Sequence, residues 1–279
     1  MKVFETDLYE YYKLEKPQGG NGVLHCYILG EYKEINAERK NPAMLVFPGG
    51  GYSSVSRREA EPVCMKYLSY GFQAFWLDYS VAPVRYPYAL TEAVMAMNYI
   101  RENADEFHVD ENMVSALGFS AGGHLCAMLG SYNGEKDVTE IFKPEKRARP
   151  DAIVLAYPVI TATRKTHGGS FLNLTGKETG NEKLSIENIV GVHSAPAFIW
   201  STFNDGVVPI RNSLVVAEAY DKAGVSFSLH IYGKGQHGLS VADMTVYGND
   251  EAIVNATKSI PEWVKLSVEW LKENGIELK

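Results

Sequence analysis

Short apolar runs alternate with stretches of helical periodicity along most of this chain. Between Ala89 and Asn103, apolar residues recur with i, i+3, i+4, i+7 spacing, which predicts an amphipathic helix. Helices are also predicted over 57–70 and 211–223, where Gly71 and Gly224 follow as stop signals. The runs that indicate buried strands are Met44–Phe47, Phe72–Leu77, Met113–Leu117, Ala152–Ala156, Ala197–Thr202 and Phe227–Tyr232.

This alternation is typical of βαβ units around a largely parallel sheet, so we expect an α/β fold. The chain before Leu45 is expected to add antiparallel edge strands. A last helix is expected to open with a capping box at Ser259–Glu262, with Pro261 in its first turn, and to end at Asn274–Gly275.

No repeat, low-complexity tract or linker divides the 279 residues, so residues 1–279 are expected to form a single domain. The segment 159–196 lies between two predicted strands and exceeds an ordinary loop, which favours a lid or insertion. Its first part, Thr161–Ser170, is polar and lacks the broad apolar face expected of a lid over a long apolar chain, so it favours a small, polar substrate. A solvated surface excursion without substrate contact is equally consistent with the pattern.

The pentapeptide Gly118-Phe119-Ser120-Ala121-Gly122 lies between a predicted strand and a predicted helix. This context is typical of a nucleophile elbow, in which a serine occupies a sharp, strained turn. Small residues two positions on either side let the helix pass close to the strand. Ser120 is therefore the candidate nucleophile.

An acyl-transfer serine also needs a base, a carboxylate that orients the base, and donors for the oxyanion. Asp205 follows the predicted strand at 197–202, at the sheet edge where α/β folds place their chemistry. His237 lies in the glycine-rich turn 233–238 after the next strand. Upstream, the strand at 44–47 runs into Pro48-Gly49-Gly50-Gly51-Tyr52, whose backbone amides can approach a substrate oxygen.

From about Leu45 to Leu271 the chain resembles the α/β-hydrolase superfamily, and most of all its acetylesterases, acetyl-xylan esterases and feruloyl-esterase-like proteins. The resemblance rests on the glycine loop, the elbow and the segments Asp78–Pro83, Asp205–Pro209 and Gly235–Gly238. It implies that Ser120 is the nucleophile, His237 the base and Asp205 its orienting partner. It further implies oxyanion amides from Ala121 and from Gly50 or Gly51, and an acetylated sugar or oligosaccharide as substrate.

Two departures set the chain apart from the hormone-sensitive-lipase-type esterases. Those proteins begin the glycine loop with His, where this chain has Pro48, and carry Arg in the tetrapeptide that reads Asp-Tyr-Ser-Val at 78–81 here. The first departure leaves the choice of oxyanion amide open, and the second argues against that subgroup.

Composition limits the functions and partners to consider. The net charge of −7 gives no electrostatic footprint for nucleic acid. The first residues lack the apolar core of a signal peptide, and no apolar stretch approaches membrane-spanning length, so a cytoplasmic location is expected. The 3 cysteines lack metal or redox spacing, and we expect neither a metal nor an organic cofactor. The expected partner is a small ester, and a homo-oligomer is left open.

Substrate contacts are harder to assign from the sequence. Tyr52 beside the glycine loop, His124 on the helix after the elbow and His167 in the 159–196 segment are candidates, each equally consistent with a structural role. A peptidase or lipid esterase of the same fold remains an alternative function. So does a hydrolase fold reused as a non-catalytic ligand receptor.

Overall fold

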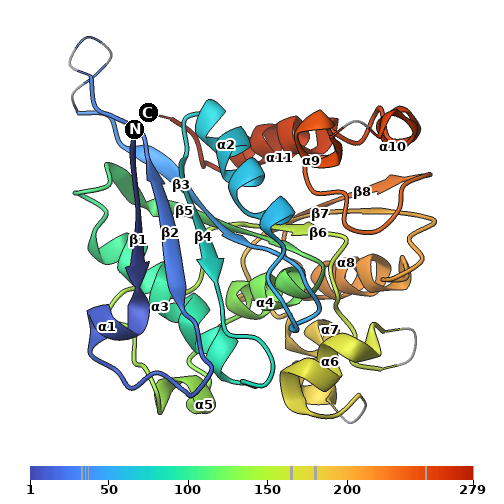
Figure 1. The fold of residues 1–279 in the computed structure, drawn as a ribbon, viewed down its shortest axis with the longest axis horizontal. Coiled ribbons are helices and arrows are strands. Elements are labelled where there is room, and N and C mark those ends of the chain that lie inside the picture. The colour runs from blue at the N-terminus through green and yellow to red at the C-terminus, as the bar shows by residue number, and fades with distance from the viewer. Residues whose placement is uncertain are drawn as a thin grey trace.

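The computed structural model describes residues 1–32, 34, 36, 38–163, 166–178, 181–248 and 250–278. Its centre is an eight-stranded sheet in the order β1-β2-β4-β3-β5-β6-β7-β8 (Figure 1). The strands are β1 (Lys2–Asp7), β2 (Val23–Ile28), β3 (Asn41–Phe47), β4 (Gln73–Asp78), β5 (Val109–Phe119), β6 (Ile153–Ala156), β7 (Ala197–Thr202) and β8 (Phe227–Tyr232).

Strands β3 to β8 pair in parallel, with β3 between β4 and β5. Strand β2 pairs antiparallel with both β1 and β4. The predicted α/β class and the antiparallel strands before Leu45 are therefore confirmed. Because the central parallel strands are buried on both faces, they are largely apolar runs. The edge strand β8 is only half-buried, and its sequence alternates instead.

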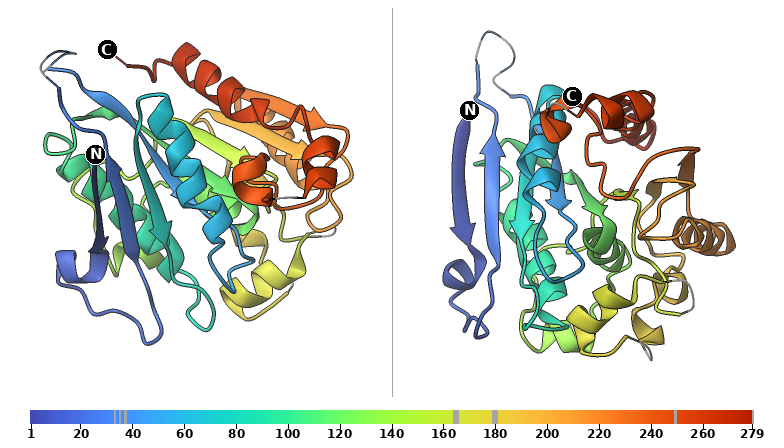
Figure 2. Two further views of the ribbon diagram at one scale, coloured as in Figure 1. Left: turned by 45° about the horizontal axis from the view of Figure 1, so that its top comes forward. Right: turned by 45° about the vertical axis from the view of Figure 1, so that its right-hand side comes forward.

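Helices cover both faces of the sheet (Figures 1 and 2). On one face, α3 (Tyr88–Glu102), α4 (Ser120–Gly130) and α8 (Arg211–Ala223) bury the larger apolar cluster. On the other, α2 (Glu61–Ser69) and α11 (Glu262–Glu273) bury the second cluster, which includes Trp200 and Trp263. None of the helices in the described ranges combines the length and apolar character needed to cross a bilayer.

The remaining helices are short. They are α1 (Leu8–Tyr12), η1 (Arg57–Glu59), α5 (Lys136–Thr139), α6 (Gly168–Thr175), η2 (Glu182–Leu184), α7 (Ile186–Ile189), α9 (Met244–Tyr247) and α10 (Glu251–Ala256). The segment 159–196 carries α6, η2 and α7, which lie together at one end of the sheet (Figure 1). Arg164, Lys165, Thr179 and Gly180 of this segment lie outside the described residues.

The capping box expected at Ser259–Glu262 is wrong. Helix α11 begins at Glu262 with Pro261 as its N-cap residue, and no side chain caps it. The turn before the helix uses backbone carbonyls instead, since the Ile260 amide donates to Thr257 O (2.8 Å) and the Trp263 amide to Ile260 O (3.0 Å). The predicted end at Asn274 and Gly275 is confirmed.

Candidate active site

Ser120 lies at the junction of β5 and α4, as the elbow motif predicts. Its φ of +52° is in the left-handed region, which costs a non-glycine residue on the order of 1–3 kcal/mol. The flanking glycines permit this turn: a Cβ at Gly118 would lie 2.2 Å from Gly122 O, and one at Gly122 would lie 2.2 Å from Phe47 O. The turn therefore holds the serine hydroxyl at the carboxyl end of the sheet.

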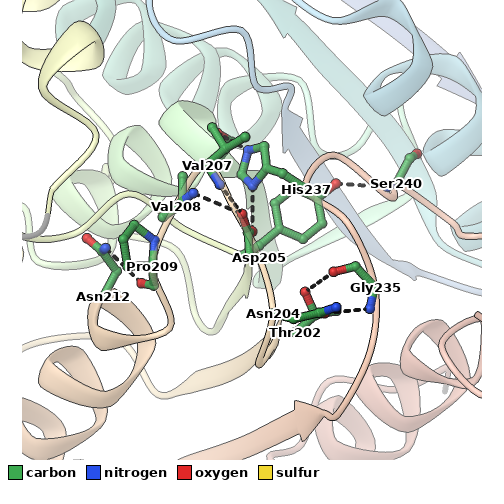
Figure 3. Close-up of polar contacts among 12 residues, drawn as sticks. Thr202, Asn204, Asp205, Val207, Val208, Pro209, Asn212, Gly235, His237 and Ser240 are labelled. Carbon is green, nitrogen blue, oxygen red and sulfur yellow. Dashed lines mark hydrogen bonds and ion pairs between the residues drawn. The ribbon is translucent and has the colours of Figure 1, made fainter.

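Three side chains from distant parts of the chain form a continuous hydrogen-bonded series at this point. His237 Nε2 lies 2.8 Å from Ser120 Oγ. On the other side of the ring, His237 Nδ1 lies 2.6 Å from Asp205 Oδ2 (Figure 3). Because a carboxylate only accepts, Nδ1 carries the proton and Nε2 is free to accept from the serine hydroxyl. The buried Asp205 is itself held by the amides of Val207 (2.8 Å) and Val208 (2.9 Å), which donate to Oδ1.

The loop that carries His237 is tied to the end of β7. Thr202 Oγ1 donates to Gly235 O (2.8 Å), and the Gly235 amide donates to Asn204 Oδ1 (2.9 Å) (Figure 3). These bonds fix the loop beside the turn that supplies Asp205. Thr202 and Asn204 were not singled out from the sequence, where no local signal connects them with Gly235.

The glycine loop after β3 faces the serine. Gly50 and Gly51 adopt φ values of +133° and +63° and line the same cavity as Ser120. Within the described part of the chain, neither of their amides donates to a protein acceptor. Ala121, in the first turn of α4, has no intrahelical acceptor for its amide either. The arrangement offers up to three backbone donors to an oxygen bound near Ser120.

The cavity at this site has a volume of about 310 Å³, and most of the side chains that line it carry a polar group. Its wall includes Ser53, Arg58, His167, Asn173 and Val207. A second hollow of about 610 Å³ adjoins it and shares two residues with it, Val207 and His237. The site is therefore open enough for a substrate that extends beyond the reacting group.

Comparison with known proteins bears on this arrangement. The BD-FAE family matches residues 30–220, more than half of the chain. The chain belongs to the BD-FAE family.

Individual proteins that are similar in sequence agree with this assignment. Endo-1,4-beta-xylanase B of Butyrivibrio fibrisolvens is 34% identical over 215 residues, covering 75% of this chain and 34% of that protein. The acetylxylan esterase of Xylanibacter ruminicola is 30% identical over 240 residues, covering 78% of this chain and 46% of that protein. The chain thus spans less than half the length of these two curated relatives.

A solved structure extends the likeness to the fold. The acetyl ester-xyloside bifunctional hydrolase of Caldicellulosiruptor lactoaceticus is 37% identical, with a TM-score of 0.77 and coverage of 91% of this chain and 89% of that one. The BD-FAE chain is thus an α/β hydrolase, as its motifs predict.

Of the three residues expected to contact the substrate of this BD-FAE protein, one lines the cavity and two are buried away from it. His167 lines the cavity and its Nδ1 lies 2.8 Å from Ser170 Oγ. Burial, followed by the charge of His237, lowers the pKa of His167. Tyr52 and His124 are instead buried, with 1% and 0% exposure, and are absent from the cavity wall.

Tyr52 and His124 form a buried link rather than a substrate surface, so we do not retain them as substrate contacts. Tyr52 OH donates to His124 Nδ1 (2.9 Å), and His124 Nε2 donates to Leu184 O (2.7 Å). Burial lowers the pKa of His124 to about 4, so the ring is neutral at pH 7. The helix after the elbow is thereby joined to both the glycine loop and the 159–196 segment.

Glu59 is a site residue that the sequence reasoning missed. It is buried in the cavity wall and accepts from the Gly49 amide (2.8 Å) and from Tyr157 OH (2.7 Å). The only signal in the sequence is a glutamate 10 residues after Gly49, which is not distinguishable there from a surface carboxylate.

Proposed function

We propose that this protein is a serine carboxylesterase that hydrolyses short-chain acyl esters, above all acetyl esters, of a carbohydrate or another small polar alcohol. The observation that carries the proposal is the series Ser120–His237–Asp205, with distances of 2.8 and 2.6 Å, beside a loop of free backbone amides. Such an arrangement can activate a serine and stabilise the tetrahedral intermediate of acyl transfer.

In the proposed reaction, Ser120 Oγ attacks the ester carbonyl carbon while His237 Nε2 takes the hydroxyl proton. Asp205 holds the imidazole in the required tautomer and stabilises the imidazolium. The amide of Ala121 and that of Gly50 or Gly51 donate to the oxyanion. The imidazolium then protonates the departing alcohol, which leaves an acyl-serine.

Water completes the cycle. His237 Nε2 takes a proton from the water that attacks the acyl-serine, a second tetrahedral intermediate forms, and the proton returns to Ser120 Oγ as the acid leaves. Each turnover consumes one water and regenerates the free serine. Apart from the ester and this water, the proposed steps use the side chains and backbone amides named above.

Two observations support a short acyl group and a polar alcohol. The cavity at Ser120 is small and its wall is rich in polar groups, among them His167 and Asn173 from the 159–196 segment, which we propose as a lid. Asn173 Nδ2 also donates to Gly51 O (2.9 Å), so the segment lies against the glycine loop. In addition, the relatives include proteins named acetylxylan esterase and acetyl ester-xyloside bifunctional hydrolase.

A fluorophosphonate probe combined with an ester series tests the proposal. We expect the probe to label Ser120 alone, and Ser120→Ala to lose both labelling and the hydrolysis of p-nitrophenyl acetate and acetylated xylo-oligosaccharides. His237→Gln should lose the same activities, whereas the matched variant His230→Gln should keep them, because His230 lies on β8 and contacts Phe198 and Ser228. Hydrolysis that survives in folded Ser120→Ala would refute the mechanism.

A further inference from the structure

The carboxyl group of Glu59 lies at the meeting point of two loops of the site. Glu59 ends η1, is 3% exposed and has both carboxyl oxygens occupied: Oε2 accepts from the Gly49 amide and Oε1 from Tyr157 OH. Both partners are donors, which is the arrangement that suits an ionised carboxylate.

The first loop that Glu59 holds is the glycine loop. Gly49 directly precedes Gly50 and Gly51, which line the cavity. A Cβ at Gly49 would lie 2.7 Å from Glu59 Oε2 and 3.0 Å from Ser120 Cβ, so Gly49 is packed tightly between the carboxyl group and the serine. The Glu59 carboxyl group therefore determines how close this loop lies to Ser120.

The second loop is the one that carries His237. Tyr157 is fully buried with a φ of +37°, and its hydroxyl accepts from the Ser240 amide (2.8 Å), three residues after His237. Figure 3 places Ser240 on the chain just beyond His237. The Tyr157 ring also packs edge-on against the His237 ring, with centroids 5.0 Å apart. A series of hydrogen bonds thus runs from Gly49 through Glu59 and Tyr157 to Ser240.

Glu59 and His237 also interact through their charges. The pKa of Glu59 is raised above its ordinary value, because the effect of burial exceeds the lowering by its bonds to Tyr157 and Gly49 and by the charges of His237 and Arg58. The interaction between the two charges is mutual, so an ionised Glu59 favours the imidazolium that His237 forms when it takes the serine proton. The other groups that interact with this pair are Asp205 and His167 around His237, and Tyr79 and Tyr247 around Glu59. Burial raises the pKa of both tyrosines, so they stay neutral near pH 7.

We propose that Glu59 is a positioning residue of the esterase reaction. Its carboxylate holds the glycine loop and, through Tyr157, the loop that carries His237 in their positions beside Ser120, and it stabilises the imidazolium of His237. This inference rests on the proposed function. Nothing in it requires Glu59 to touch the substrate.

The test compares Glu59→Gln with a matched control elsewhere in the chain. Glu92 is also fully buried and also accepts from a tyrosine hydroxyl (Tyr9, 2.9 Å) and a backbone amide (Ser80, 2.6 Å), but it lies on α3, away from the cavity wall. We expect Glu59→Gln to lower kcat on p-nitrophenyl acetate by about tenfold or more with little change in KM, because oxyanion alignment acts in the transition state. Glu92→Gln should keep the wild-type kcat when measured well below its unfolding temperature.

The pH profile separates positioning from a merely structural role. Loss of the carboxylate charge removes a stabiliser of the imidazolium, so the acid limb of kcat/KM in Glu59→Gln should move to lower pH, by about half a unit or more. Tyr157→Phe keeps the charge and breaks the tie to Ser240, so it should lower kcat without this shift. A Glu59→Gln variant with wild-type kcat and an unmoved acid limb would overturn the proposal, as would equal losses in Glu59→Gln and Glu92→Gln.

The rate at which a fluorophosphonate labels Ser120 keeps this test independent of the substrate. If wild type is labelled rapidly but cleaves no short-chain ester, the proposed function fails while the labelling rates of the variants still judge Glu59. If Glu59→Gln does not fold, Tyr157→Phe tests the proposal in its place. A labelling rate reduced about tenfold supports the positioning of the His237 loop through Tyr157, and an unchanged rate overturns it.

Discussion

A methyl group added at Gly122 should separate the elbow helix from the glycine loop. An ideal Cβ at this position would lie 2.2 Å from Phe47 O and 2.4 Å from Pro48 O, whereas ordinary contact begins at 3.4 Å. Both obstacles are backbone atoms at the end of β3, so no side chain can rotate away. In Gly122→Ala, either α4 or the start of the glycine loop has to move by about 1 Å.

The expected cost is larger in activity than in stability. Overpacking a well-packed site costs about 1–3 kcal/mol, and replacing a helical glycine by alanine returns about 1 kcal/mol. The free energy of unfolding should therefore fall by no more than about 2 kcal/mol. Because Pro48 leads into Gly50 and Gly51, the same movement displaces the proposed oxyanion donors from Ser120, and a misplacement of this size lowers kcat by about 100-fold.

The assay is kcat and KM for p-nitrophenyl acetate together with urea unfolding, with Gly130→Ala as control. Gly130 ends the same helix, and the three atoms nearest to a Cβ there all belong to the side chain of Ile153, with its terminal Cδ1 at 2.8 Å. The control should lose a similar amount of stability and keep its kcat. Wild-type kcat in folded Gly122→Ala would refute the reasoning that close packing at this glycine sets the distance between loop and serine.

Four further results are expected. Acetate or propionate esters should exceed octanoate esters in kcat/KM, because the cavity of about 310 Å³ is small and, among the described residues, Val207 is the one apolar side chain in its wall. A longer acyl chain would therefore gain little of the roughly 0.8 kcal/mol that each buried methylene contributes; a steady rise through eight carbons would favour a lipid esterase. Asp205→Asn should lower kcat by about 10³–10⁴ through the wrong imidazole tautomer while circular dichroism stays unchanged, and a loss below tenfold would argue against the assigned role. The pKa of His124 is lowered to about 4 from its ordinary value, so its contribution to stability is complete above about pH 6.5 and is lost as pH falls towards 4, by up to about 3 kcal/mol; urea titrations at pH 7 and 4.5 should show a smaller acid loss in His124→Asn than in wild type. The pKa of Glu92 is raised to about 7, chiefly by burial, so its contribution is present below about pH 4.5 and is lost as pH rises through 7; Glu92→Gln should therefore gain stability relative to wild type between pH 5 and 8, and a constant difference would count against the shift.

The sequence alone was sufficient for the fold class and the sheet, and it singled out Ser120, Asp205 and His237, which the structure brings within hydrogen-bond distance of one another. Each of these depends on a local pattern: an apolar run of strand length, a helical period, or a glycine next to a reactive side chain at a strand end. Even the antiparallel strands before Leu45 could be predicted, because the parallel sheet accounts for the rest of the chain. The capping box before α11 failed because the helix begins at Glu262, with Pro261 rather than Ser259 as its N-cap residue, and a backbone-bonded turn at 257–263 precedes it.

Only the tertiary structure decided what surrounds these residues. In the folded protein Tyr52 and His124 are buried and hydrogen-bonded in series to Leu184 O. His167 lies in the cavity wall, and Glu59 lies between Gly49 and Tyr157. Glu59 and Tyr157 are 98 residues apart, and neither has a neighbour in the chain that reveals the other. Local patterns report how each segment buries its own apolar face, whereas a hydrogen bond between buried polar groups exists only after the packing of distant segments has removed water from both.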